Sequence, residues 1–247
     1  MDLIACSITL YFIIKLCTCA PNEMTLIFTG DISLDGPIRF NADNRNCSYA
    51  DAFQPIKSEL VADHVIANLE SPVSKHASSY SKKDTLKGKN ILNLGDARGL
   101  EALTASGIGI VGLANNHFGD FGERANFDTI DALKEANIRY LGVAERKEPS
   151  RSSNEKPLKQ KPLILSKNGI NVALLAYVLH KKDLFDPMSS TWNIKPALYT
   201  RETVRKDVEV LKKNESIHAV IVMAHWDQEY STMPMEDEEP HNAWYAI

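Results

Sequence analysis

Short apolar runs alternate along the chain with stretches whose apolar residues recur every three or four positions. This alternation predicts strands separated by helices. We expect strands at 25–29, 64–67, 107–114, 138–142, 162–166, 170–177 and 219–224. We expect helical segments at 53–60, 96–106, 123–136 and 200–213. Strands and helices in such an order are typical of an α/β domain with a largely parallel sheet.

Polar residues and glycines sharpen several of these boundaries. Asp96 and Thr200 suit helix N-cap positions, and Gly107 suits the position just after a helix. Residues 167–169 read Lys-Asn-Gly between two strand candidates, which indicates a hairpin and adds an antiparallel portion to the sheet. The polar stretches 71–94 and 145–161 are expected to be loops.

Residues 1–23 differ from the rest of the chain. The run from Leu3 to Ile14 is mostly apolar and shorter than the roughly 20 residues of a membrane-spanning helix, but it has the length of a signal-peptide core. Asp2 stands where a signal peptide has basic residues. We expect a signal or anchor segment and a membrane-associated or extracytoplasmic protein. The alternative is a spurious start, with Met24 as initiator and a cytoplasmic protein. In both cases 24–247 form one domain.

The composition excludes several classes of protein. The 247 residues are 44% hydrophobic and 24% charged, as in ordinary globular proteins. A net charge of −4 argues against a nucleic-acid partner. Cys6, Cys17 and Cys19 crowd near the N-terminus and no Cys-x-x-Cys pair is present, so we expect neither a disulfide framework nor a cysteine zinc site.

Four strand candidates run directly into polar residues of the metal-ligand or acid–base type. These are Asp31 after the first, Asn68 and Glu70 after the second, Asn115, Asn116, His117 and Asp120 after the third, and His225 and Glu229 after the last. Ligands of α/β sheets bind at the carboxyl ends of strands, so we expect these side chains to converge at one sheet edge. Taken singly, each has a plain structural explanation, such as a cap or a turn. An unrelated α/β binding domain is therefore an alternative.

Carboxylates, amide oxygens and imidazoles together favour a divalent ion, namely manganese, iron, zinc or magnesium. A pair of such ions about 3.5–4 Å apart can clamp a phosphoryl group, and a histidine that is not a ligand can protonate the leaving oxygen. We therefore expect one or two divalent metal ions as cofactors.

Four segments at these strand ends resemble the CapA family of capsule-synthesis proteins, which is linked to poly-γ-glutamate. They read FTGDISL, ANLESPVS, GLANNHFGDFG and AHWDQEY, and the resemblance runs from Thr25 to the C-terminus. The family is a relative of the calcineurin-like metallophosphoesterases. The resemblance therefore implies an α/β fold of that type, a sheet sandwich flanked by helices.

The resemblance also implies roles for individual residues. The metal ligands it implies are Asp31, Glu70, Asn116 and His225, with Asn68 and Glu229 as additional candidates. His117 matches the general acid, oriented by Asp120. The implied function is metal-assisted phosphoryl or acyl-phosphate chemistry, of the phosphoesterase-hydrolase type, in the synthesis of a capsule or cell-envelope polymer. The implied partners are an anionic polymer or phosphorylated substrate and other capsule-synthesis subunits at a membrane.

Two departures from the family pattern suggest a second function. Ser33 stands where phosphoesterases place a histidine, and no GHHPH-type motif follows His225. We therefore expect a chain that is truncated at its C-terminus and lacks the last strands of the fold. The alternative function is a non-catalytic, membrane-associated accessory or scaffold subunit that keeps the fold.

Overall fold

The computed structural model describes residues 23–45, 47–85, 92–145, 159–179 and 192–226. Its first sheet is parallel and four-stranded, in the order β1-β2-β5-β6. The strands are β1 (Leu26–Ile32), β2 (His64–Leu69), β5 (Ile108–Gly112) and β6 (Arg139–Leu141). All four coincide with predicted strands to within three residues at either end. They are short apolar runs because both faces of this sheet are buried.

A second, three-stranded sheet has the order β12-β10-β9. Its strands are β9 (Leu163–Lys167), β10 (Ile170–Val178) and β12 (Ala219–His225). β10 and β12 run parallel, whereas β9 and β10 form the predicted hairpin. Asn168 and Gly169 have φ angles of 50° and 80°, as a two-residue hairpin turn requires. The hairpin prediction is confirmed.

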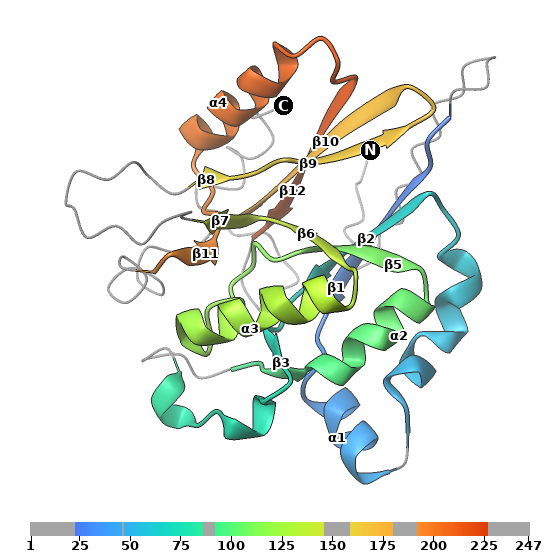
Figure 1. Ribbon diagram of the computed structural model, residues 1–247, viewed down its shortest axis with the longest axis vertical. Coiled ribbons are helices and arrows are strands. Elements are labelled where there is room, and N and C mark those ends of the chain that lie inside the picture. Colours follow the sequence, from blue (N-terminus) through green and yellow to red (C-terminus); the bar gives the residue numbers. More distant parts are fainter. Residues whose placement is uncertain (1–22, 46, 86–91, 146–158, 180–191, 227–247) are drawn as a thin grey trace, which may run out of the picture.

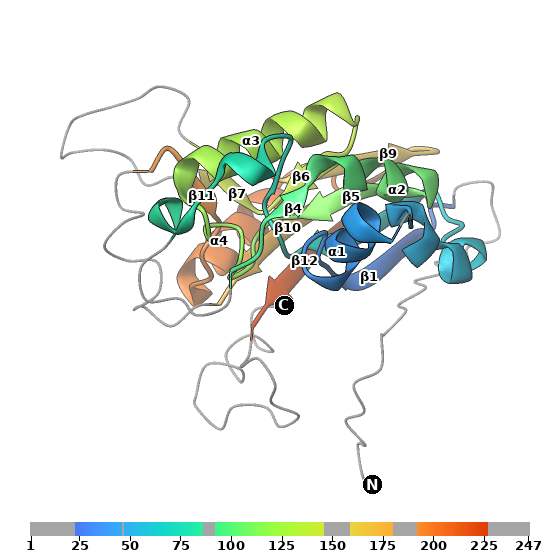
Figure 2. The same cartoon turned by 90° about the horizontal axis from the view of Figure 1, so that it is seen from below.

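The two sheets pack face to face between helical layers (Figures 1 and 2). The helices are α1 (Pro37–Asn44), α2 (Leu100–Ala105), α3 (Gly122–Glu135) and α4 (Arg201–Lys212). In Figure 1, α1, α2 and α3 lie beside the first sheet, and α4 lies on the opposite side of the molecule beside β10 and β12. This is the sheet sandwich flanked by helices that the family resemblance implies.

Alternate residues of the central strands face different layers. Val65 and Val111 pack in the cluster shared with α2 and α3, whereas Ile66 and Ile110 pack with Leu174 of β10 between the sheets. The strand pattern alone predicts a single, largely parallel sheet, and in this respect it is wrong. A strand that is buried on both faces has the same apolar sequence pattern whether a helix or a second sheet covers it.

The hydrophobic pattern does not predict several short strands, because these strands pair with segments far away in the sequence. One small sheet combines β11 (Ile194–Pro196), β7 (Val143–Glu145) and β8 (Lys159–Gln160), and another pairs β3 (Val73–Ser74) with β4 (Gly95–Asp96). Short 3-10 helices span Tyr49–Ala52, Gln54–Glu59, Ala77–Ser79, Lys82–Asp84 and Ala97–Gly99. The helical pattern predicted at 53–60 therefore forms 3-10 turns, and the stretch 71–94 is only partly a loop.

The predicted element ends agree with the structure. The Asp96 carboxylate accepts a hydrogen bond from the Arg98 N–H at 2.9 Å and caps the turn that leads into α2. Thr200 Oγ1 accepts from the Thr203 N–H at 3.0 Å at the start of α4. Gly107 has a φ of 93°, which a residue with a Cβ rarely adopts, and α2 stops before it.

The predictions for the N-terminus lie outside the described residues, which begin at residue 23. Met24 is 6% exposed and packs in the core between the two sheets. None of the helices in the described part of the chain is long and apolar enough to cross a membrane.

Candidate metal centre

Strand register brings Asp31, Asn68 and Glu70 to the carboxyl ends of neighbouring strands. Asp31 pairs with Asn68 across β1 and β2, beyond a register shift that follows Phe28. The Glu70 N–H donates to the Ile32 carbonyl at 2.8 Å, which extends the pairing by one residue. Asn68 also pairs with Gly112 at the end of β5. The backbone ladder of the first sheet therefore positions one wall of the site.

His225 forms the opposite wall and comes from the second sheet, at the end of β12. Its Nδ1 lies 3.7 Å from Asp31 Oδ1, and its Nε2 lies 3.5 Å from Glu70 Oε1. One ligand atom from each of Asp31, Glu70 and His225 lies within 4.8 Å of the other two. We predicted convergence because each residue would follow a strand of one sheet. The residues do converge, but that reason is wrong for His225, because the sandwich brings its sheet over the first.

Asn116 adds an amide oxygen to this cluster. Its Oδ1 lies 3.0 Å from His225 Nε2, on the same side of the ring as Glu70. Two atoms bound to one ion at about 2.1 Å and at right angles lie about 3 Å apart. The distances from His225 Nε2 to the Asn116 oxygen and to the Glu70 oxygen, 3.0 and 3.5 Å, are therefore compatible with one divalent ion. The chemistry of these atoms also suits manganese, iron, zinc or magnesium.

The site is open to small molecules on one side. The Asp31 side chain is 53% exposed, whereas those of Glu70 and His225 are 21% and 22% exposed. A carboxylate at the surface beside a half-buried imidazole can be reached by an ion and by a substrate from solvent.

His117 and Asp120 form a buried pair next to the cluster in sequence. The Nδ1 atom of His117 lies 2.7 Å from Asp120 Oδ2, and the two residues are 3% and 0% exposed. The same Asp120 oxygen accepts the Asn93 backbone N–H at 2.8 Å. Asp120 is thus held from two sides and fixes the orientation of the His117 ring.

The turn that carries Asn116 and His117 is built by Asn115, which the sequence pattern placed among the polar strand-end residues and the family resemblance did not include among the ligands or acids. Asn115 Oδ1 accepts the backbone N–H groups of His117 and Phe118 at 3.1 and 2.9 Å. An asparagine that caps its own turn in this way is common. Its role is therefore to cap the turn and not to bind the ion.

The remaining predicted residues lie differently. Asn68 Nδ2 donates to Asp31 Oδ1 at 2.7 Å, and its Oδ1 accepts from Asn115. Glu229 lies outside the described residues.

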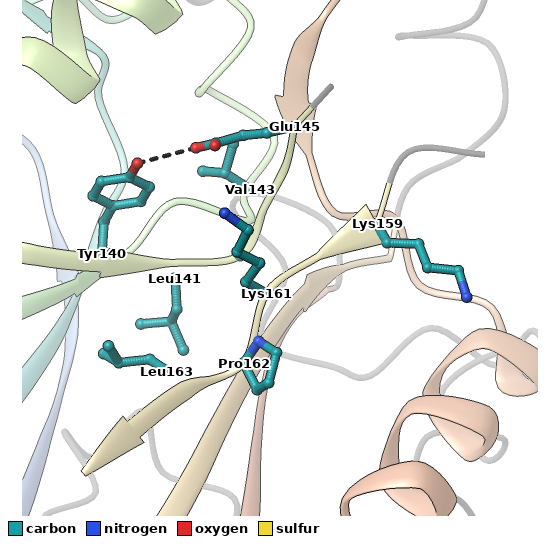
Figure 3. Close-up of a pocket in the computed structure, with 9 residues that line it drawn as sticks. Tyr140, Leu141, Val143, Glu145, Lys159, Lys161, Pro162 and Leu163 are labelled. Carbon is teal, nitrogen blue, oxygen red and sulfur yellow. Dashed lines mark hydrogen bonds between the residues drawn. The ribbon is translucent and has the colours of Figure 1, made fainter. Parts of the chain in front are cut away.

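A separate pocket of about 270 Å³ lies between β6, β7, β8 and β9 (Figure 3). Leu141, Val143 and Leu163 supply apolar parts of its wall, and Tyr140 donates to Glu145 at its rim at a distance of 3.0 Å. None of the predicted site residues lines it, so it is distinct from the strand-end cluster.

The chain is similar to two bacterial proteins of capsule and PGA biosynthesis. It is 27% identical over 224 residues to the capsule biosynthesis protein CapA of Bacillus anthracis, which covers 88% of this chain and 50% of that protein. It is 24% identical over 221 residues to the PGA biosynthesis protein CapA of Bacillus subtilis, which covers 89% of this chain and 53% of that protein. The chain therefore spans about half the length of these relatives.

Two solved structures that the chain matches at low sequence identity are a calcineurin-like phosphoesterase and a 5′-nucleotidase. The calcineurin-like phosphoesterase YfkN of Bacillus subtilis matches 83% of this chain and 62% of its own, with a TM-score of 0.43 and 16% identity. A 5′-nucleotidase from Staphylococcus aureus, described as putative, matches 90% of this chain and 41% of its own, with a TM-score of 0.47 and 12% identity.

The family assignment comes from a match to a family model over most of this chain. The model described as bacterial capsule synthesis protein PGA_cap matches residues 25–243, which include all four segments that suggested the resemblance. This chain belongs to the bacterial capsule synthesis protein PGA_cap family.

Proposed function

We propose that this protein is a metal-dependent phosphoesterase-type enzyme in the synthesis of an anionic capsule or cell-envelope polymer. Its substrate is a phosphorylated precursor or an acyl phosphate on such a polymer. The observation that carries the proposal is the meeting of Asp31, Glu70 and His225 within 4.8 Å, from two different sheets. Membership of the capsule-synthesis family supports the biological setting.

In this proposal Asp31, Glu70, Asn116 and His225 hold the divalent ion. A bound ion supplies charge stabilisation at a phosphoryl or acyl-phosphate oxygen and makes a water molecule more acidic. The half-exposed Asp31 leaves one side of the site open to substrate. The carboxylates of Asp31 and Glu70 repel an anionic substrate unless a cation lies between the carboxylates and the substrate. Without the ion, these residues would therefore bind such a substrate poorly.

His117 is the proposed general acid. Its ring orientation follows from the 2.7 Å contact between Nδ1 and Asp120, which leaves Nε2 as the nitrogen that carries the transferred proton. Protonation of the leaving oxygen by His117 is the step assigned to this pair.

The test uses the full-length chain. Binding of Mn²⁺ and of Zn²⁺ is measured by calorimetry, and turnover is measured with para-nitrophenyl phosphate, bis-para-nitrophenyl phosphate and acetyl phosphate. We expect binding of at least one of the two ions and turnover of at least one of the substrates. His225→Ala should abolish or strongly weaken ion binding.

His218→Ala is the matched control. His218 precedes the other end of β12, where its Nδ1 accepts the Asn171 N–H at 3.1 Å, so its loss should leave ion binding unchanged. Wild-type protein that binds neither ion would overturn the proposed metal centre. Protein that binds an ion but turns over none of the three substrates would overturn the catalytic role and favour an accessory subunit in capsule synthesis.

A further inference from the structure

The side chain of Asn115 has no freedom to turn over. It is 0% exposed, and its Oδ1 accepts two backbone N–H groups, those of His117 and Phe118. Its Nδ2 donates to the Leu69 carbonyl at 2.8 Å and to Asn68 Oδ1 at 3.1 Å. A rotation of the amide by 180° would place its NH₂ group against two donors and its oxygen against two acceptors. The backbone therefore dictates which end of Asn115 faces Asn68.

This fixed orientation dictates that of Asn68. Asn115 offers a donor, so the Asn68 oxygen must face it, and the Asn68 NH₂ group must face the opposite direction. There Nδ2 donates to Asp31 Oδ1 at 2.7 Å and lies 3.2 Å from His225 Nδ1. An NH₂ group has only hydrogens to offer, so Asp31 Oδ1 is the acceptor in the shorter of these two contacts.

Asn68 thus contacts a predicted metal ligand on the neighbouring strand. Asp31 lies on β1, which pairs with β2. The NH₂ group holds Oδ1 of Asp31 at hydrogen-bond distance, and Asn68 itself is only 9% exposed. Hydrogen bonds to ligand side chains of this kind fix ligand orientation in metal sites.

We propose that Asn115 and Asn68 form a positioning relay for the metal centre, in which Asn68 orients Asp31 and does not itself ligate the ion through its oxygen. The relay transmits the orientation of the backbone turn after β5 to a ligand on β1. This inference rests on the proposed metal centre, and it assigns Asn68 a role different from the additional ligand that the family resemblance implies.

The first test compares Asn68→Ala with wild type in Mn²⁺ calorimetry. Loss of an orienting partner typically weakens metal binding by about 10–100-fold, and we expect a change of this size with unchanged stoichiometry. The visible absorption of Co²⁺ at saturation distinguishes orientation from ligation. The relay predicts the same Co²⁺ spectrum in both proteins, because the ligand set is the same. A changed spectrum at saturation would make Asn68 a ligand and overturn the relay.

The second test is a double-mutant cycle with Asn115→Ala. If Asn115 acts on the ion partly through Asn68, the fold-losses of the two single variants will not multiply in the double variant. If the fold-loss in the double variant equals the product of the fold-losses in the two single variants, Asn115 does not act through Asn68. Asn68→Ala alone still decides the proposal if Asn115→Ala does not fold.

Asn126→Ala is the matched control for the loss of a buried amide. Asn126 lies on α3, is 0% exposed, and donates to the Ile194 carbonyl at 3.1 Å away from the metal centre. It should lose stability and keep the wild-type Mn²⁺ affinity. Wild-type protein that binds no Mn²⁺ would overturn the metal centre and the relay together. If wild type binds Mn²⁺ and Asn68→Ala binds it with the same affinity, the relay is overturned and the metal centre is not.

Discussion

The two ring nitrogens of His225 face different residues of the candidate site. Nδ1 faces Asp31 and Asn68, whereas Nε2 faces Glu70 and Asn116. His117, by contrast, contacts Asp120 through Nδ1 in a buried pair. The two histidines therefore differ in surroundings as a ligand and a general acid should.

This difference predicts different outcomes for two substitutions. His117→Ala should keep the Mn²⁺ affinity of wild type and lower turnover by about 10²–10⁴-fold, the usual contribution of a general acid. His225→Ala should lose Mn²⁺ binding. The measurement is calorimetric Mn²⁺ affinity beside turnover of the substrate that wild type accepts. Equal loss of Mn²⁺ from both variants would make His117 a ligand and contradict the assignment.

At the scale of secondary structure, Gly142 connects β6 to β7 and determines how closely the turn at Asn115 packs against the second sheet. Gly142 has a φ of 83°, and a Cβ built on it would lie 2.8 Å from Ala114 Cβ and 3.0 Å from Ala176 Cβ. Its carbonyl accepts the Ala197 N–H at 2.8 Å. Ala114 directly precedes the Asn115 turn, so a shift here would reach the site.

Gly142→Ala should therefore destabilise the protein. Overpacking costs about 1–3 kcal/mol and a left-handed residue with a Cβ costs about 1–2 kcal/mol more, so we expect a loss of at least about 2 kcal/mol in the free energy of unfolding. Urea denaturation measures it. Gly109→Ala in β5 is the control, because a Cβ there meets nothing within 4 Å, and its stability should change little. Similar losses in both variants would contradict this account of Gly142.

At the scale of the whole molecule, an ion pair joins the two sheets at the end remote from the metal centre. Asp63, just before β2, pairs with Lys167 at the end of β9 and accepts the Thr25 N–H at 2.7 Å. The hydrogen bond from Lys167, followed by that from the Thr25 backbone, lowers the pKa of Asp63 from 3.8 to about 2. Asp63 therefore links β1, β2 and β9 through its charged form.

The lowered pKa predicts how stability depends on pH. A carboxyl whose pKa is lower in the folded state stabilises the fold fully above its unfolded value, and this contribution is lost as pH falls through the folded value. Asp63→Asn should thus be less stable than wild type at pH 7. The difference should begin to narrow near pH 4 and close towards pH 2. Urea denaturation of both proteins from pH 7 to pH 3 measures it, with Lys167→Met as a second variant that removes the ion pair. A difference that is constant with pH would contradict the role of the charge.

Much of the fold and the identities of the candidate ligands were already determined by the sequence, because they depend on local features. The hairpin needs Asn168 and Gly169, the start of α4 needs Thr200, and the end of α2 needs Gly107. All of these act within a few residues of chain. The apolar runs placed Asp31, Glu70, Asn116 and His225 among the polar residues near strand ends, and the family resemblance then selected these four as candidate ligands.

Only the tertiary structure decided which layer covers each strand and which atoms meet. Ile66 and Leu174 are equally apolar, and nothing local states that they face each other across two sheets instead of lying in one. The two-residue strands β3 and β4 depend on pairing with each other across an intervening segment, so no periodicity marks them. The orientation of Asn68 likewise depends on Asn115, 47 residues later, whose own orientation depends on backbone groups that only the folded turn brings together. The direction of these hydrogen bonds and the order of the layers depend on contacts between segments that are distant in the sequence. The hydrophobic pattern along the chain therefore does not predict them.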